Sequence, residues 1–189
     1  MKLEVNLGVQ SKVTPVIEDV QAWAKDNKKF IKEFSKFILE SGAIALSANQ
    51  LLVDGEVSEA RICGFRTGDD ECEFWINPKI TDVKGKPEPN IETCLTHGFE
   101  KLVVADRVKA VKVTYTDVKG SEVKVMSEGD DSLAVQHAID HLDGIHEFLM
   151  DLPQDIDDTI VKIEDVTFHP VKLNRAQTRN KKKRARKKK

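Results

Sequence analysis

The sequence predicts one α+β domain in which antiparallel strands pack around a central helix. Three observations predict this fold class: a helical pattern near the N-terminus, alternating strand patterns in the middle, and a second helical pattern after them. No internal repeat is visible, and the strands do not alternate with helices as they do in parallel α/β folds. With 189 residues, of which 40% are hydrophobic and 33% charged, the chain can bury a core without disulfides.

The first predicted helix spans residues 16–41, where no Gly or Pro occurs and apolar side chains recur every three or four residues. These apolar residues are Val20, Trp23, Phe30, Ile31, Phe34, Phe37 and Ile38. We expect a break near Asp26–Asn27 and a C-terminal end at Gly42.

A β-hairpin is predicted over residues 61–78, because two short apolar runs flank the turn residues Thr67–Asp70. A loop is expected at residues 87–90, which hold two prolines and an asparagine. Alternating apolar residues then predict half-buried strands over 102–104 and 111–125, with a turn at Lys119–Gly120.

The last predicted helix runs from about Ser132 to Asp143 and ends at Gly144. Turn and capping residues precede it, and its apolar residues have helical spacing. Since apolar residues become rare after position 170, we expect the folded domain to cover residues 1–170 and a tail to cover residues 171–189.

The predicted tail is strongly basic. The last eighteen residues hold eleven of the 30 Lys and Arg and no acid, which leaves a net charge of about −13 on residues 1–171. The tail should be disordered when free and dock electrostatically on a polyanion; a solvated tail, or one folded onto the acidic body, is the alternative. The proposed polyanion-binding residues are Lys181, Lys182, Lys183, Arg184, Arg186, Lys187, Lys188 and Lys189.

The cysteine content and the hydropathy pattern favour a cytoplasmic protein. Cys63, Cys72 and Cys94 are too few for a disulfide framework and fit a reducing compartment. No apolar run has the length of a signal-peptide core or of a membrane span.

Two histidines and a cysteine form a candidate metal site. His137 and His141 are four residues apart, so on a helix both imidazoles project from one face. Cys94 would add a thiolate, and three protein ligands leave one position of a tetrahedral ion open, as in catalytic sites. The alternatives are two histidines that merely cover a helix surface and a cysteine that acts as a small buried hydrophobe.

Three separated motifs resemble those of peptide deformylases. Residues 136–144 (Gln-His-Ala-Ile-Asp-His-Leu-Asp-Gly) resemble Q-H-E-x-D-H-L-x-G, residues 92–96 (Glu-Thr-Cys-Leu-Thr) resemble E-G-C-L-S, and residues 43–50 resemble G-Φ-G-Φ-A-A-x-Q. Their order is that of the family, and Asn77-Pro78 matches a family Asn-Pro. The similarity covers roughly residues 5–150.

The resemblance implies a metal-dependent amide hydrolase that removes the formyl group from the N-terminal formyl-methionine of nascent polypeptides. One divalent ion would be its cofactor, Fe(II) or a substitute such as Zn(II) or Ni(II). By matched position, Cys94, His137 and His141 would be the metal ligands. The Gln50 side chain and the backbone N–H of Leu95 would donate hydrogen bonds to the oxyanion that forms during attack on the formyl carbonyl.

Further matched positions imply a substrate pocket and groups that orient the ligands. The family's pocket for the methionine side chain is lined by positions that match Ile44, Leu133, Ala134 and the ring edge of His137. Arg107 and Asp140 match an arginine and an aspartate that would orient the metal ligands. Because the family docks on ribosomes through its C-terminal segment, the polyanion bound by the tail would be ribosomal RNA.

The main departure from the family pattern is Ala138, which stands where the family has a glutamate that transfers the proton. Loss of such a group typically lowers the rate by about 10² to 10⁴. Glu92 and Asp140 are the nearby carboxylates, and we expect neither to replace it. The alternative to a hydrolase with impaired activity is a non-catalytic, metal-containing module that binds nascent N-termini or ribosomal RNA.

Overall fold

The computed structural model describes residues 1–7, 12–97, 102–145 and 148–150. The helices are α1 (Val20–Asp26), α2 (Lys28–Ser41) and α3 (Asp130–Leu142), with short 3-10 turns η1 (Ala48–Gln50) and η2 (Leu95–His97). The strands are β1 (Leu3–Val5), β2 (Ala45–Ser47), β3 (Leu51–Val53), β4 (Glu56–Val57), β5 (Ile62–Arg66), β6 (Cys72–Lys84), β7 (Glu88–Thr93), β8 (Leu102–Arg107), β9 (Ala110–Thr116), β10 (Glu122–Glu128) and β11 (Phe148–Met150).

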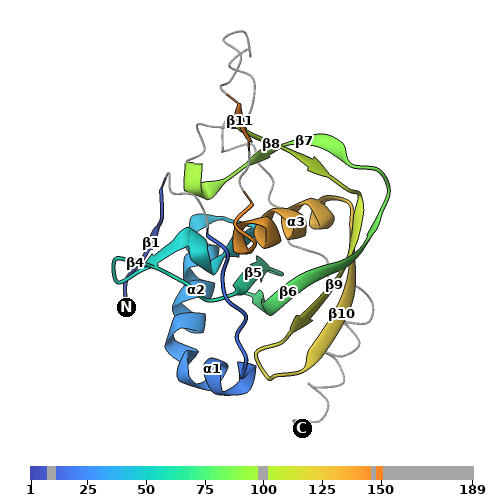
Figure 1. The fold of residues 1–189 in the computed structure, drawn as a ribbon. Coiled ribbons are helices and arrows are strands. Elements are labelled where there is room, and N and C mark those ends of the chain that lie inside the picture. The colour runs from blue at the N-terminus through green and yellow to red at the C-terminus, as the bar shows by residue number, and fades with distance from the viewer. Residues whose placement is uncertain (8–11, 98–101, 146–147, 151–189) are drawn as a thin grey trace.

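The predicted α+β class is confirmed, and α3 lies in the middle of the fold. Figure 1 shows β5 and β6 on one side of α3 and β7 and β8 on the other. The strands form antiparallel sheets in the orders β10-β9-β6-β5-β2, β1-β3-β4 and β11-β8-β7. Within the described residues, β2 and β7 are therefore edge strands of two different sheets.

The N-terminal helical region is interrupted at the predicted place. Asn27 separates α1 from α2, and α2 ends at Gly42, whose φ of 71° is the left-handed conformation that glycine adopts without strain. The helical region begins at Val20, later than residue 16, because the Asp19 side chain accepts a hydrogen bond from the Ala22 N–H and caps α1 there.

The predicted hairpin and the predicted strands around the Lys119–Gly120 turn are confirmed. In the hairpin, β5 pairs with β6 from the Ile62–Ile76 pair to the Arg66–Cys72 pair. Beyond that pairing β6 continues to Lys84, where it pairs with β9 across two register shifts. β9 and β10 pair along their whole length.

The predicted loop at residues 87–90 is wrong, because β7 begins at Glu88 and includes Pro89 and Asn90. Pro89 is opposite Asp106 of β8 in the antiparallel register. Proline has no N–H to donate to a neighbouring strand, but an edge strand needs ladder hydrogen bonds on one side only. The edge position of β7 thus accommodates residues that predict a loop in the sequence.

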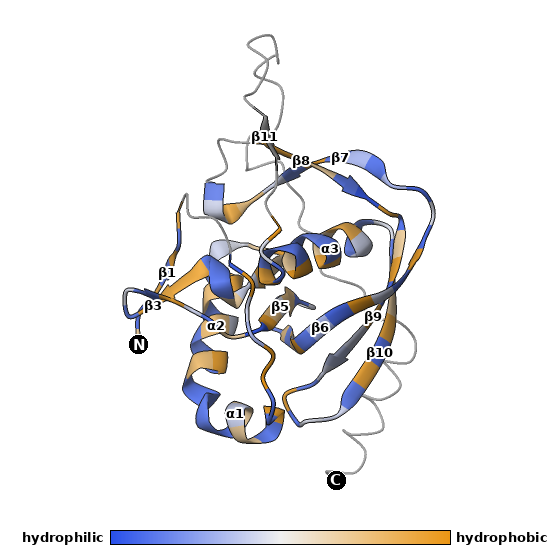
Figure 2. Cartoon of the chain, viewed as in Figure 1, coloured by the Kyte–Doolittle hydropathy of each residue, from blue (hydrophilic) through white to orange (hydrophobic). Residues whose placement is uncertain are grey.

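The predicted C-terminal helix is confirmed as α3, which starts two residues early at Asp130 and is followed by Gly144 with a φ of 66°. Its side chains Val135, Ala138, Ile139 and Leu142 are buried in a cluster with residues of β5, β6, β9 and β10. The alternation of polar and apolar residues along α2 and α3 is visible in Figure 2.

A second cluster packs α2 against the other face of β5 and β6. Phe34 and Ile38 are completely buried there, and the Phe34 and Phe74 rings lie 5.5 Å apart. The stacked rings of Trp75 and Tyr115, with centroids 4.4 Å apart, belong to the first cluster. Residues 151–170 of the predicted domain and the basic tail lie outside the described residues. In the part that is described, no helix combines the length and apolarity needed to span a bilayer.

Candidate metal centre

Three potential metal ligands from two distant parts of the chain meet beside α3. The Cys94 Sγ lies 3.3 Å from the His141 Nε2, which lies 3.2 Å from the His137 Nε2. One ligand atom from each residue falls within 4.8 Å of the others. Spacing and resemblance predict that these residues form one site, and the structure brings them together.

The two elements that carry these residues determine how they meet. His137 and His141 are one turn apart on α3, with ring centroids 4.9 Å apart. Cys94 lies between β7 and η2, and its side chain is buried. Two imidazole nitrogens and one thiol sulfur suit zinc and other borderline transition metals, so the residues fit a divalent ion.

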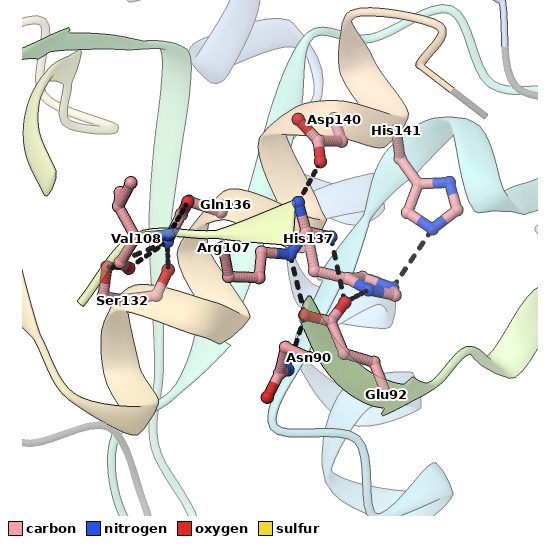
Figure 3. A network of polar contacts seen from close by, with 9 residues as sticks. All are labelled: Asn90, Glu92, Arg107, Val108, Ser132, Gln136, His137, Asp140 and His141. Atoms are coloured by element: carbon pink, nitrogen blue, oxygen red, sulfur yellow. Dashed lines mark hydrogen bonds and ion pairs between the residues drawn. The ribbon is translucent and has the colours of Figure 1, made fainter. Parts of the chain in front are cut away.

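Glu92 orients the ring of His137. The Glu92 Oε2 lies 2.8 Å from the His137 Nδ1, and the His137 Nε2 faces His141 on the other side of the ring (Figure 3). A carboxylate at Nδ1 favours the tautomer with its proton there, which leaves the Nε2 lone pair available for a metal. Its place in the sequence identifies Glu92 only as a nearby carboxylate, without this role.

Arg107 holds Glu92 in this position. Its Nε and Nη2 donate to the two carboxylate oxygens of Glu92 over 2.7 and 2.9 Å, and its Nη1 donates to Asp140. Asn90 also donates to Glu92, over 2.9 Å. Figure 3 shows Glu92 between Arg107 and His137. Arg107 therefore influences the position of His137 only through the Glu92 carboxylate.

The ion pair between Glu92 and Arg107 shifts the pKa values of both side chains. Burial raises the pKa of the Glu92 carboxyl, but hydrogen bonds from His137 and Arg107 outweigh burial and lower the pKa to about 2. Burial also disfavours the charge of Arg107, and the hydrogen bonds to Glu92 and Asp140 raise its pKa above the usual value. Both side chains of the Arg107–Glu92 pair are therefore charged at neutral pH.

Gln136 ties the end of β8 to α3 beside this ion pair. Its side-chain Oε1 accepts from the Val108 N–H over 3.1 Å, and its Nε2 donates to the Val108 carbonyl over 2.8 Å. The Ser132 hydroxyl donates to the same carbonyl. These contacts, also drawn in Figure 3, hold β8 and therefore Arg107 against the helix.

Gln50 approaches the triad from the other side. Its Oε1 accepts from the Ser47 N–H over 2.9 Å, which directs its Nε2 toward the Thr96 Oγ1 at 3.0 Å and the Cys94 Sγ at 3.6 Å. The amide N–H donors of Gln50 thus lie beside the candidate ligands. Thr96 is a neighbour of this amide that the sequence analysis did not single out.

The segment that contains Gln50 also anchors the C-terminal half of α3. The Asn49 Nδ2 donates to the His141 carbonyl over 2.6 Å, and the Ser47 hydroxyl donates to the Ala138 carbonyl over 2.5 Å. Arg61 donates to the carbonyl of the following residue, Leu142, over 3.1 Å. These contacts fix the helix position from which the two histidines project.

A cavity of about 230 Å³ reaches the triad at His137 and is lined mainly by apolar side chains. Ile44, Leu133 and Ala134, which the resemblance assigned to a substrate pocket, all line it, as do Leu95 and His137. The cavity lies between β2 and β7, since residues of both strands contribute to its wall.

Ala138 does not line this cavity. Ala138 is 1% exposed and packs in the core cluster that contains Cys63 and Phe65. The Cys63 Sγ lies 3.5 Å from the Ala138 carbonyl, and burial raises the pKa of the Cys63 thiol to about 12. Cys63 therefore stays a neutral thiol in the core, which distinguishes it from the cysteine at the triad.

Comparison with known proteins relates the whole domain to one family. The family model for polypeptide deformylase matches residues 8–152. The peptide deformylase of Natranaerobius thermophilus is 35% identical over 109 residues, covering 56% of this chain and 64% of that protein. The peptide deformylase of Rhodopirellula baltica is 32% identical over 127 residues, covering 64% of this chain and 59% of that protein. The chain thus spans about three fifths of the length of these relatives.

Solved structures share the fold at lower sequence identity. The peptide deformylase of Thermotoga maritima superposes with a TM-score of 0.64 at 24% identity, covering 77% of this chain and 94% of that chain. The peptide deformylase of Synechococcus elongatus, solved in complex with actinonin, gives a TM-score of 0.63 at 21% identity, covering 75% and 74% of the two chains. These likenesses establish the fold.

Removal of the buried guanidinium should destabilise the domain strongly. We expect Arg107→Ala to lower the free energy of unfolding by about 3–5 kcal/mol, because Glu92 and Asp140 would lose the charge that pairs them. Urea denaturation followed by circular dichroism measures this loss. The control is Lys109→Ala, which removes an exposed partner of Glu88 and should cost about 0.5 kcal/mol or less. Equal losses in the two variants would contradict the structural role of Arg107.

Proposed function

The chain belongs to the peptide deformylase family, and we propose that it removes the formyl group from the N-terminal formyl-methionine of newly made polypeptides. The observation that carries this proposal is the meeting of Cys94, His137 and His141 beside an apolar cavity, with His137 and Gln50 in the cavity wall and the Gln50 amide beside the thiol. A donor triad alone can hold a structural metal. A triad that opens onto a cavity and has a hydrogen-bond donor beside it can act on a substrate.

Cys94, His137 and His141 would hold one divalent ion, for which we propose Fe(II), with Zn(II) or Ni(II) as substitutes. When bound, the ion supplies Lewis acidity to the carbonyl and the water that react. Glu92 and Arg107 keep the His137 ring in the orientation that this requires.

Gln50 and Leu95 would stabilise the charge that develops on the formyl oxygen. The Gln50 Nε2 is directed by the Ser47 N–H acting on the opposite end of the amide, so its donors are already oriented before substrate binds. Preorganised donors need no rearrangement as charge develops, which is why they favour the transition state. The backbone N–H of Leu95, directly after Cys94, is the second donor in this proposal.

The cavity suits a linear, unbranched apolar side chain such as methionine. Ile44, Leu133 and Ala134 provide apolar wall, and the volume of about 230 Å³ leaves room for one such side chain. The strands beside the cavity, β2 and β7, are both edge strands within the described residues, so their free backbone groups can pair with an extended peptide.

Proton transfer is the step for which this chain is poorly equipped. Ala138 cannot transfer a proton, and its side chain is packed in the core. The Glu92 carboxylate already binds His137, Arg107 and Asn90. The Asp140 carboxylate already binds Arg107. We therefore propose slow hydrolysis, by a factor of about 10² to 10⁴ relative to a site with a positioned acid/base.

We further propose that residues 1–170 form the catalytic domain and residues 171–189 a basic tail that docks on ribosomal RNA in the cytoplasm. The tail has eleven cationic side chains and no acid, while the rest of the chain is acidic. Phosphate contacts of this kind bind without sequence preference and weaken steeply with salt.

The metal ligands can be tested by metal content. We expect anaerobically purified protein to contain about one divalent ion per chain by inductively coupled plasma mass spectrometry, and Cys94→Ala to lose it because three ligands become two. The matched control is Cys63→Ala. It removes a cysteine that is about as deeply buried as Cys94, and this variant should keep the ion. Full metal content in Cys94→Ala would exclude this ligand set.

The hydrolase proposal is tested by restoring a carboxylate at position 138. We expect Ala138→Glu to deformylate a short formyl-methionyl peptide about 10²-fold faster than the unaltered chain, since the missing proton carrier returns. Ala138→Gln is the matched control, because it has the same size and burdens the core equally but cannot transfer the proton. Thermal unfolding of both variants reports any packing cost.

The outcomes of this comparison separate three readings. A gain with glutamate but not with glutamine supports a site that lacks only its acid/base. If the unaltered chain already matches the glutamate variant, another group transfers the proton. Binding of the peptide without turnover in every variant would instead favour the non-catalytic module.

The tail can be tested by sedimentation with ribosomes. We expect the full chain to co-sediment at low salt and to dissociate steeply as salt rises, and a chain ending at residue 171 to stay in the supernatant. A chain whose residues 172–189 are shuffled keeps the charge and should still bind. If truncation leaves co-sedimentation unchanged, the tail is not the ribosome-binding element.

A further inference from the structure

A larger hollow between β7 and the start of α3 adjoins the cavity at the triad. This second hollow, of about 530 Å³, shares two residues of its wall, Asp130 and Leu133, with the first. Pro89, Lys109 and Glu128 are among its other lining residues. A peptide whose first side chain occupies the cavity at the triad can therefore extend past Asp130 and Leu133 into the second hollow.

The charges along this path do not cancel. Arg107 is neutralised by Glu92 and Asp140, and Lys109 pairs with Glu88 over 3.4 Å. Among the ion pairs of the described residues, none includes Glu128 or Asp130. The wall of the path therefore carries uncompensated negative charge.

Asp130 is the acidic residue that both hollows share, and an apolar side chain lies next to it. Leu133 follows Asp130 by three positions on α3, so the two side chains lie on the same face of the helix. A lysine or arginine side chain has an apolar stem and a cationic end. Its stem can pack on Leu133 while its charge approaches the Asp130 carboxylate.

We infer that Asp130 makes this site prefer formyl-methionyl peptides that carry a lysine or arginine directly after the methionine. The inference rests on the proposed function, because it assumes that formyl-methionine occupies the cavity at the triad. It adds a preference for charge that the apolar cavity alone does not give. Asp130 acts here as a specificity-determining residue and takes no part in the chemical step.

Asp130 also lies in the first turn of α3, where a negative charge stabilises the helix dipole. Asp131 occupies the same turn and has the same effect on the dipole, but it lines neither hollow. Asp131→Asn is therefore the matched control, because it changes the charge at the helix terminus without changing the wall of the path.

The experiment compares formyl-Met-Lys-Ala-Ser with formyl-Met-Gln-Ala-Ser on the metal-loaded full chain. Each peptide competes with one fluorescent formyl-methionyl peptide, so affinity is measured even when turnover is slow. We expect the lysine peptide to bind about two- to five-fold more tightly at low salt, the size of effect that an exposed ion pair gives. The preference should shrink as salt rises.

The variants decide whether Asp130 is responsible. Asp130→Asn should remove the preference, Asp130→Lys should reverse it toward formyl-Met-Glu-Ala-Ser, and Asp131→Asn should keep it. Equal binding of the lysine and glutamine peptides to the unaltered chain, or a preference that survives in Asp130→Asn, would overturn the inference while leaving the proposed function intact. Failure of every formylated peptide to bind would overturn both.

Discussion

The need to neutralise one buried guanidinium connects most of the elements around the site. Arg107 comes from β8, and its two partners, Glu92 and Asp140, come from β7 and α3. A charge in this position is tolerated only while it is paired, so the pairing holds the β7 and β8 strands against the helix. The same Glu92 carboxylate sets the orientation of His137. The geometry of the candidate ligands therefore depends on an ion pair between two residues that are not ligands themselves.

A second set of contacts acts on α3 from the opposite side. Ser47 and Asn49 donate to helix carbonyls, and Gln50 reaches across to the loop that carries Cys94. Three residues of one four-residue segment thus contact both halves of the triad, the helix with the histidines and the loop with the cysteine. Their side chains are buried, and these hydrogen bonds hold their partners at defined distances.

The sequence predicts the parts of this fold that have a local signature. The helical spacing of α2 and α3, the hairpin of β5 and β6, and the four-residue spacing of the histidines are all visible along the chain. The three-residue strands β1, β2 and β3 are too short to show a period. Pro89 led to the prediction of a loop where the structure has the edge strand β7. The position of Glu92 between His137 and Arg107 has no local signal, because the β7–β8 pairing and the packing of α3 create it.

The packing of Ala138 separates what the fold requires from what hydrolysis requires. Its methyl group fills a place in the core, while the cavity, the three ligand atoms and the oriented amide are built by other residues. Stability and ligand recognition therefore place no demand on a proton carrier at this position. Along an evolutionary lineage, the proton carrier at this position can therefore be lost in one substitution while the cavity, the ligand atoms and the oriented amide stay in place.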